Sequence, residues 1–241
     1  LVNYQILRER LEEEGMMFQT TNDTEVILYL ITRYYDGDIV EAIKKTMKVI
    51  KGAYSVTALI KDKVVAFRDP HGFRPLVLGK DGEDVIVASE NAPIEIIGGE
   101  MTRNVEPGEI IVIDESGIRS DRFESSATAK NCIFEYVYFA RNDATLDDIN
   151  AYTFRRRCGE ILWDEAPCDV DLVVPVPDSG IPSAIGYAQA SMIPYGEGLV
   201  KNRYMGRTFI KPTQKERDMA VKLKLNPVGD VVKGKSIVLL D

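Results

Sequence analysis

The sequence predicts two domains of different class, an α+β domain built on antiparallel strands followed by an α/β domain built on a parallel sheet. In residues 1–125, helical patterns are followed by short strand-like runs that tight turns connect. In residues 126–241, apolar runs and helical patterns alternate in the order strand, helix, strand, which is typical of a doubly wound parallel sheet. The stretch 121–131 is polar, charged and poor in apolar residues, so we place the domain boundary there.

Two helices are predicted in the first domain before its strands begin. The polar segment Thr21–Glu25 has the composition of a helix N-terminus and precedes the apolar run Val26–Tyr34. Asp38 is a favoured N-cap residue, and the apolar residues after it lie on one helical face until Gly52. The strand-like runs, which turn residues separate, are 53–60, 64–69, 75–78, 84–88, 109–113 and 117–119.

The second domain begins with Cys132–Phe139, which is mostly apolar and aromatic. A helix is predicted over 149–163 and a shorter one over 182–190. Between them, Leu172–Val176 is an uncharged apolar run of the kind found in strands buried on both faces. Later strands of the same sheet are predicted at 198–200 and 236–240.

The composition is that of a globular protein, with 45% hydrophobic residues among 241 and a net charge of −8. Its three cysteines show no CxxC spacing, and no apolar stretch approaches the length of a membrane span or a signal peptide. We therefore expect a reduced, cytoplasmic protein that does not contact a membrane. The chain starts at Leu1 without a methionine and stops at Asp241 directly after an apolar strand, so we expect it to be cut at both ends.

A basic run over residues 201–224 is the main departure from this acidic composition. It holds eight Lys or Arg against Glu216 and Asp218, so its net charge is +6 and that of the remaining residues is −14. Such segregation favours an anionic ligand. Nucleic acid would need more neutralising contacts than one short run offers, so a small phosphorylated substrate fits better. The alternative is an exposed helix with charge pairs, which suits Lys215–Lys224 better than Lys201–Lys211.

Polar residues follow two strands of the predicted parallel sheet. Asp178 and Ser179 come after Leu172–Val176, and Asp241 ends the strand 236–240. Because ligands bind outside the carboxyl ends of parallel strands, we expect all three residues at one edge. The loop with Asp178 and Ser179 suits a pyrophosphate or its metal, and the carboxylate of Asp241 suits Mg²⁺ or sugar hydroxyls. The alternatives are an ordinary helix cap and an ordinary polar strand end.

The first domain offers fewer candidates for chemistry. A carboxylate within Thr21–Glu25 would suit a substrate amino group, although the segment by itself predicts only a helix N-terminus. His71 is the only histidine, and without a neighbouring nucleophile we expect it to structure its loop. No Ser-His-Asp arrangement can be built from these residues.

Several long motifs, in order along the chain, resemble the amidophosphoribosyltransferase family, also called glutamine phosphoribosylpyrophosphate (PRPP) amidotransferases. The second half contributes CIFEYVYFAR (132–141), VPVPDSG (174–180) and KNRYMGRTFIKPTQ (201–214). The first half contributes TTNDTE, GAYSV, RDPHGFRPL and PGE. The resemblance implies an incomplete N-terminal-nucleophile glutaminase domain, an antiparallel sandwich, in 1–125. It implies an incomplete type I phosphoribosyltransferase domain, a parallel sheet, in 126–241.

In this family the first domain frees ammonia from glutamine. The second uses the ammonia to displace pyrophosphate from PRPP, giving 5-phosphoribosylamine in the first step of purine biosynthesis. By position, Asp23 resembles the carboxylate that holds the glutamine amino group. Asp178–Gly180 resembles the pyrophosphate loop, and Ser179 and Asp241 resemble Mg²⁺ ligands.

The basic segment Lys201–Lys211 resembles the family's loop that closes over PRPP. The phosphate contacts that the resemblance implies are Lys201, Arg203 and Arg207. Tyr204 or Ile210 would line the path of the ammonia.

The resemblance has gaps at both ends of the chain. The family's nucleophile is a cysteine at the mature N-terminus, and both it and an Asn-Gly pair expected before Leu1 are absent. The second Asp and the Gly/Thr-rich loop expected after Asp241 are absent too. We therefore expect no catalytic residue in this chain and no activity from it as given. Asn142 stands where the family commonly has Pro, in a turn that should not affect the mechanism.

Cys132 stands where some members hold one ligand of a [4Fe–4S] cluster. The resemblance therefore implies Mg²⁺ and, in some members, this cluster as cofactors of the complete enzyme. The resemblance also implies purine nucleotides as feedback inhibitors, and a homo-oligomer. Two alternatives stay open, a plain phosphoribosyltransferase that uses a nucleobase and a non-catalytic PRPP-binding regulator. TTNDTE, RDPHGFRPL and PGE favour the amidotransferase, because neither alternative accounts for them.

Overall fold

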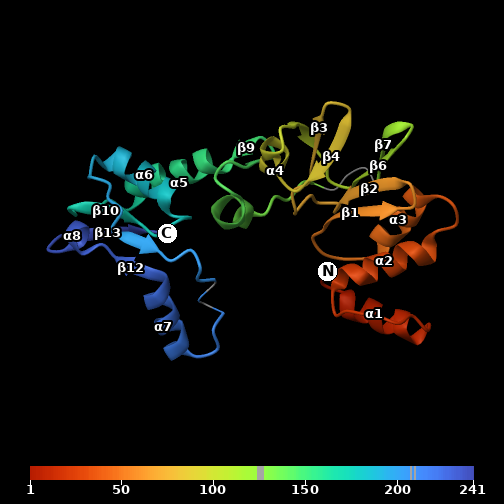
Figure 1. Ribbon diagram of the computed structural model, residues 1–241, viewed down its shortest axis with the longest axis horizontal. Coiled ribbons are helices and arrows are strands. Elements are labelled where there is room, and N and C mark those ends of the chain that lie inside the picture. Colours follow the sequence, from red (N-terminus) through yellow and green to blue (C-terminus); the bar gives the residue numbers. More distant parts are fainter. Residues whose placement is uncertain (124–127, 207, 209) are drawn as a thin grey trace. The chain divides into compact units, whose positions relative to one another are not determined.

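The computed structural model describes residues 1–123, 128–206, 208 and 210–241 (Figure 1). Contacts divide this part of the chain into two compact units. The first unit comprises Leu1–Ile133 and Thr145–Asp147, and the second comprises Phe134–Ala144 and Asp148–Asp241. The domain limits predicted from the sequence, 1–125 and 126–241, stay a prediction.

The first unit joins helices to two antiparallel sheets, of strand order β1-β2-β6-β7 and β4-β3-β5. Its helices are α1 (Tyr4–Glu13), α2 (Asp23–Tyr34), α3 (Ile39–Val49) and α4 (Asn91–Ile96). Its strands are β1 (Ser55–Ile60), β2 (Lys63–Arg68), β3 (Val77–Asp81), β4 (Asp84–Ala88), β5 (Glu100–Asn104), β6 (Glu109–Asp114), β7 (Gly117–Arg122) and β8 (Thr145–Leu146). Both predicted helices and all six predicted strands are confirmed, with shifted bounds, whereas α1, α4, β5 and β8 were not predicted.

Side-chain caps explain where the helices α2 and α3 begin. The Asn22 side chain accepts a hydrogen bond from the N–H of Thr24 at 3.0 Å, and Asp38 accepts one from Val40 at 2.9 Å. Such caps satisfy N–H groups that have no partner inside the helix. Because Asn22 is the cap of α2, the carboxylate of Asp23, its first residue, is left for another role.

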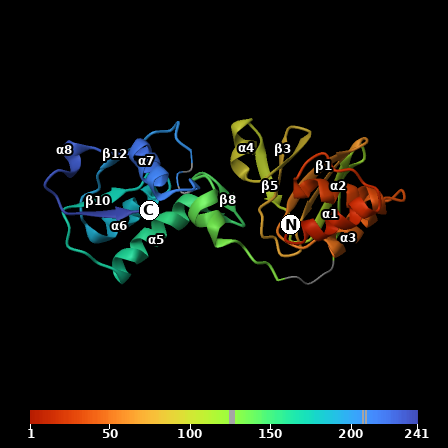
Figure 2. The ribbon, with the colours of Figure 1, turned by 90° about the horizontal axis from the view of Figure 1, so that it is seen from below.

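The second unit surrounds a parallel pair of strands, β10 and β13, with α5 and α6 beside them in Figure 2. Its helices are the π-helix η1 (Glu135–Phe139), α5 (Ala151–Glu165), α6 (Ile181–Ser191), α7 (Gln214–Lys224) and α8 (Gly229–Val232). Its strands are β9 (Ile149–Asn150), β10 (Leu172–Pro175), β11 (Leu199–Lys201), β12 (Leu225–Pro227) and β13 (Ile237–Leu240).

The helices α5 and α6 pack backbone against backbone. A Cβ atom added to Gly159 would lie 1.9 Å from the carbonyl oxygen of Ser183, and one on Gly186 would lie 2.0 Å from that of Arg156. No larger residue fits at either position without moving a helix.

The predicted strand 198–200 does not belong to the parallel sheet. It is found as β11, which pairs in antiparallel fashion with β12, from Leu199 opposite Pro227 to Lys201 opposite Leu225. The reason is that residues just before it already lie along β10, where Tyr195 forms a parallel bridge with Val173. The parallel pairing of the other two strands is confirmed.

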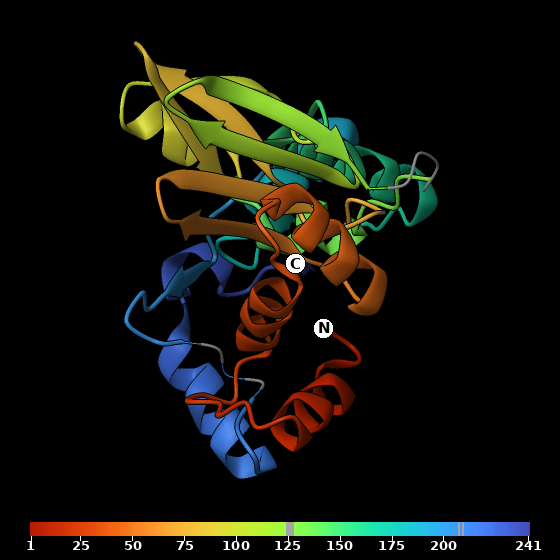
Figure 3. The same ribbon diagram turned by 90° about the vertical axis from the view of Figure 1, so that its right-hand side faces the viewer.

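The end of the basic run forms the helix α7, as the alternative interpretation of Lys215–Lys224 predicted. Thr213 and Glu216 form a capping box at its start. Figures 1 and 3 both show α7 projecting from the strands of its own unit, to which β12 joins it.

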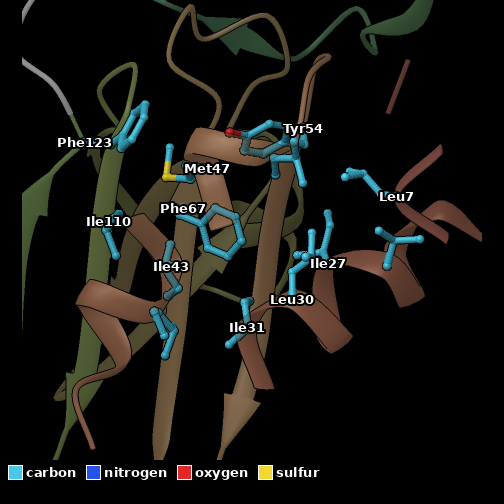
Figure 4. Packing of buried hydrophobic residues seen from close by; sticks show 14 of the residues in the cluster. Leu7, Ile27, Leu30, Ile31, Ile43, Met47, Tyr54, Phe67, Ile110 and Phe123 are labelled. Atoms are coloured by element: carbon cyan, nitrogen blue, oxygen red, sulfur yellow. The ribbon is translucent and has the colours of Figure 1, made fainter. Parts of the chain in front are cut away.

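The central strands of the larger sheet, β2 and β6, are buried on both faces, whereas every residue of the edge strand β7 is exposed. On one face, Phe67 of β2 and Ile110 of β6 pack against Ile43 of α3 and the other helices, as Figure 4 shows. On the other face, Ala66 packs against residues of the second sheet such as Leu78. Burial of each large apolar side chain stabilises the fold by about 1.5–3 kcal/mol, so this core contributes much of the stability of the first unit.

Candidate functional site

A cavity of about 610 Å³ opens at one edge of the parallel strands of the second unit. Pro175 of β10 lies opposite Leu240 of β13, so the residues that follow both strands emerge at the same edge. Asp178, Ser179 and Asp241 all line the cavity, together with Lys201. The structure therefore brings together residues that are more than sixty positions apart in the sequence, at the edge where ligands of such sheets bind.

The loop that contains Asp178 and Ser179 is tied to the end of β13. The N–H of Val176 donates to the carbonyl oxygen of Leu240 at 2.7 Å. A Cβ atom on Gly180 would lie 2.2 Å from that same oxygen, so only glycine allows this approach. Gly180 is also the N-cap of α6, and the interpretation of Asp178 and Ser179 as an ordinary helix cap is therefore wrong.

Positive charge dominates the lining of this cavity. Four basic side chains, Arg141, Arg155, Lys201 and Lys224, line it against the two carboxylates Asp178 and Asp241. The ammonium of Lys201 donates to Asp178 Oδ2 at 2.6 Å. Since 61% of the Asp178 side chain is exposed, this ion pair is weak enough for an incoming anion to compete for the ammonium.

Of the remaining predicted residues of the basic loop, the three that the structure describes do not line the cavity. Arg203 is exposed, and Tyr204 and Ile210 are 99% and 67% exposed. Arg207 lies outside the described residues. Thr208 is the residue of this segment, beside Lys201, that the cavity does include.

Residues 138–142 form a further wall of the cavity, although nothing in their sequence connected them to the site. Arg155, on α5, lines it as well and is only 5% exposed. An arginine in a polar helix is expected at the surface, so the sequence carried no signal for its burial.

The first unit holds a second cavity, of about 460 Å³, beside the start of α2. Asp23, Tyr54 and Arg74 line it. The side chain of Asn22 caps α2, so the carboxylate of Asp23 is available to a ligand of this cavity. Its role toward a substrate amino group stays a prediction, and the helix N-terminus expected from the sequence is present as well.

Buried polar residues hold the loop that carries Arg74. Arg68 Nε donates to the carbonyl oxygen of Arg74 at 2.7 Å, and Ser55 Oγ donates to it at 3.0 Å. Asp69, which is fully buried, accepts from the N–H of His71 at 2.9 Å. His71 Nδ1 lies 3.2 Å from the carbonyl oxygen of Thr128, so the histidine structures this loop as predicted.

Comparison with known proteins identifies relatives over the full length of the chain. Residues 1–95 match a glutamine amidotransferase domain family. The chain is 47% identical to the amidophosphoribosyltransferase of Methanothermobacter thermautotrophicus and 42% identical to that of Bacillus subtilis, in each case over 100% of this chain and 51% of the relative. Over its whole length this chain is homologous to amidophosphoribosyltransferases. The resemblance of the motifs is thereby confirmed.

The solved amidophosphoribosyltransferase structures agree with this result. The glutamine PRPP amidotransferase from B. subtilis, complexed with ADP and GMP, matches at a TM-score of 0.90 and 42% identity, covering 99% of this chain and 52% of that one. The α/β character of the predicted fold is consistent with this neighbour. The chain spans about half the length of the curated amidophosphoribosyltransferases it matches.

The donor set for metals differs between the two predicted sites. Ser179 and Asp241 offer hard oxygen atoms in one cavity, which fits Mg²⁺ bound by one or two protein ligands and substrate phosphates. For the cluster, Cys132 is one of three free cysteines, fewer than the four thiolates that a [4Fe–4S] cluster takes. Within the described ranges, no group of three or more His, Cys, Asp or Glu side chains could hold a metal.

The part of the chain that the structure describes contains no helix with both the length and the apolar character needed to cross a bilayer.

Proposed function

We propose that this chain is part of an enzyme that transfers ammonia from glutamine to PRPP, giving 5-phosphoribosylamine, glutamate and pyrophosphate. The observation that carries the proposal is the meeting of Asp178, Ser179, Lys201 and Asp241 in one cationic cavity at the edge of the parallel strands. The homology to amidophosphoribosyltransferases over the full chain supports it independently.

In this proposal the second unit binds PRPP and stabilises its leaving group. Pyrophosphate carries several negative charges, and Lys201, moving from Asp178 to a phosphate oxygen, would neutralise part of them. The loop Asp178–Gly180 would present backbone N–H groups to the same phosphates. Ser179 and Asp241 would hold Mg²⁺, which when bound offsets the charge that develops on the departing pyrophosphate.

The first unit would bind the glutamine that supplies the ammonia. Asp23, whose carboxylate lines the cavity of this unit, would accept hydrogen bonds from the substrate ammonium. We assign the two packed antiparallel sheets of this unit to an N-terminal-nucleophile glutaminase sandwich, and the second unit to a type I phosphoribosyltransferase. The match of residues 1–95 to a glutamine amidotransferase domain supports the first assignment.

Regulation and assembly are further parts of the proposal. The B. subtilis neighbour was solved with ADP and GMP, which supports purine nucleotides as inhibitors of the whole enzyme. We also propose a cytoplasmic homo-oligomer. The [4Fe–4S] cluster stays part of the proposal for the whole enzyme, with Cys132 as one ligand and the other ligands outside residues 1–241.

The glutamine amidotransferase match also favours the proposed enzyme over one of the alternatives. A phosphoribosyltransferase that uses a nucleobase has no need of a glutamine-binding domain, and residues 1–95 match one. A non-catalytic regulator would bind PRPP as well, and it differs from the proposed enzyme only in the absence of turnover.

Calorimetric titration of the 241-residue chain with PRPP and Mg²⁺ tests the binding site. We expect the dissociation constant to rise at least tenfold in Lys201→Ala, because a charge-assisted hydrogen bond contributes about 1.5–3 kcal/mol. Lys215→Ala is the matched control, since this lysine belongs to the same basic run but does not line the cavity. Equal affinities of the two variants would refute the proposed phosphate contact.

A further inference from the structure

The side chain of Arg155 is bound on all three of its nitrogens. Nε donates to the carbonyl oxygen of Tyr136 at 2.7 Å, Nη2 to that of Ala140 at 2.8 Å, and Nη1 to Asn142 Oδ1 at 2.6 Å. The guanidinium is planar and rigid, so three such bonds fix the positions of their acceptors relative to one another. All three acceptors belong to a single segment, residues 136–142.

This segment lines the same cavity as the pyrophosphate loop. Residues 138–142 belong to the lining, and η1 ends at Phe139 in their midst. Carbonyl groups at the end of a helix lack partners within it, and a buried carbonyl without a partner is destabilising. Arg155 supplies partners to two of them, those of Tyr136 and Ala140.

The helix that carries Arg155 is itself fixed to the pyrophosphate-loop side of the cavity. The carbonyl oxygen of Arg155 accepts a hydrogen bond from Ser183 Oγ at 3.0 Å, and Ser183 lies in the first turn of α6. At Gly159 the two helices also approach backbone to backbone, next to Ser183. Since α6 begins directly after Gly180, Arg155 connects the wall 138–142 to the loop 178–180.

We propose that Arg155 is a positioning residue that sets the separation of these two walls, and with it the affinity of the cavity for pyrophosphate. The inference rests on the proposed function of the cavity and adds a residue that acts through the wall. All three nitrogens of Arg155 donate to residues of this wall, so Arg155 can set the separation without contacting the ligand.

Asn142 has a larger part in this arrangement than its sequence position suggested. The sequence analysis treated it as a turn residue without effect on the mechanism. In the structure it lines the cavity, and its side chain accepts the shortest of the three bonds from Arg155. A proline at this position could not supply that side-chain acceptor.

Calorimetric titration with inorganic pyrophosphate and Mg²⁺, on the 241-residue chain, tests the proposal. We expect Arg155→Ala to raise the dissociation constant at least tenfold, Asn142→Ala about threefold, and Arg155→Lys by an intermediate factor. Guanidinium chloride at millimolar concentration should restore part of the affinity of Arg155→Ala and leave the wild type unchanged. Arg157→Ala is the control, because this arginine lies on the same helix, is 67% exposed and pairs only with Glu160 among the contacts described.

The outcomes separate the proposal from the function on which it rests. If the wild type binds no pyrophosphate, the proposed function of the cavity fails and this inference fails with it. If the wild type binds and folded Arg155→Ala binds equally well, the positioning role is wrong while the cavity keeps its function. If Arg155→Ala does not fold, wild-type affinity in both Arg155→Lys and Asn142→Ala overturns the proposal.

Discussion

The two units each hold one wall of their cavity with a buried arginine, but the two arginines bind different kinds of partner. Arg68, 2% exposed, donates to the carbonyl oxygens of Gly72, Arg74 and Val105, at 2.7–2.8 Å, and faces the Asp147 carboxylate at 3.3 Å. Arg155 donates within one continuous segment. The acceptors of the first arginine therefore lie in three separate segments of its unit, namely the loop 72–74, Val105 and Asp147, whereas the second shapes a single wall.

A buried arginine can therefore serve the stability of a whole unit, as Arg68 does, or the local geometry of one segment, as Arg155 does. Loss of a residue that joins distant segments affects the whole unit, because every segment loses a partner at once. Loss of a residue that binds one segment changes the position of that segment. The comparison leads to three predictions about stability, of decreasing size.

The largest effect is expected for Arg68→Met. The variant would leave three carbonyl groups and the Asp147 carboxylate without the guanidinium, so the free energy of unfolding should fall by roughly 3–5 kcal/mol. Urea unfolding measures it. Arg119→Met is the control, because Arg119 is 61% exposed and its ion pair should contribute no more than about 1 kcal/mol. Equal losses in the two variants would mean that Arg68 does not join its unit together.

A smaller effect is expected in the second unit for Gly159→Ala. The added methyl group would meet the backbone oxygen of Ser183 at 1.9 Å, so α5 and α6 must separate, at a cost of roughly 1–3 kcal/mol. Thermal unfolding reports the cost, and pyrophosphate affinity should fall with it because the wall and the loop move apart. Gly229→Ala, where a methyl group meets nothing within 4 Å, should leave both measurements unchanged. An unchanged affinity in a destabilised Gly159→Ala would separate helix packing from the cavity.

The smallest effect concerns the pH dependence of the first unit. Burial alone would raise the pKa of Glu109, but hydrogen bonds from Arg103, Ser120 and the Glu106 N–H outweigh it and lower the pKa below its usual 4.5. The carboxylate therefore stabilises the fold above pH 4.5, and this contribution is lost as the pH falls through the lowered pKa.

Urea unfolding at pH 7 and pH 3 tests this sign. We expect the loss of stability on acidification to be smaller in Glu109→Gln than in the wild type. Asp62→Asn, in an exposed turn, serves as the control variant. If Glu109→Gln loses as much stability on acidification as the wild type does, Glu109 is excluded as a source of the pH dependence.

The sequence predicted the elements whose signals are local. Asp38 and the apolar spacing after it fixed the start of α3, and short alternating runs located six strands of the first unit. It did not predict α4 and β5, whose placement depends on distant contacts. A Cβ atom on Gly79 of β3 would lie 2.7 Å from the Ile94 side chain, so it is a glycine fifteen positions earlier that makes room for α4.

For the candidate site as well, the sequence predicted the residues that a local pattern or a general rule can locate, and it missed the others. Asp178, Ser179 and Asp241 follow apolar strands, and the rule for parallel sheets was enough to place them at one edge. The pairing of β11 with β12 could not be predicted, because a three-residue strand carries too little pattern to identify its partner. Arg68 and Arg155 were missed because their carbonyl acceptors are backbone groups, which every residue possesses and no sequence pattern reveals.

The parallel pairing of β10 with β13 also determines when each cavity can form during synthesis. The cavity around Asp23 is lined by residues no later than Ser89, so its walls can assemble while the second unit is still being made. The loop after β10 instead waits for Leu240, whose carbonyl oxygen holds Val176 and approaches Gly180. On the ribosome, where segments fold in the order in which they emerge, the site for the amino group should precede the site for the phosphates.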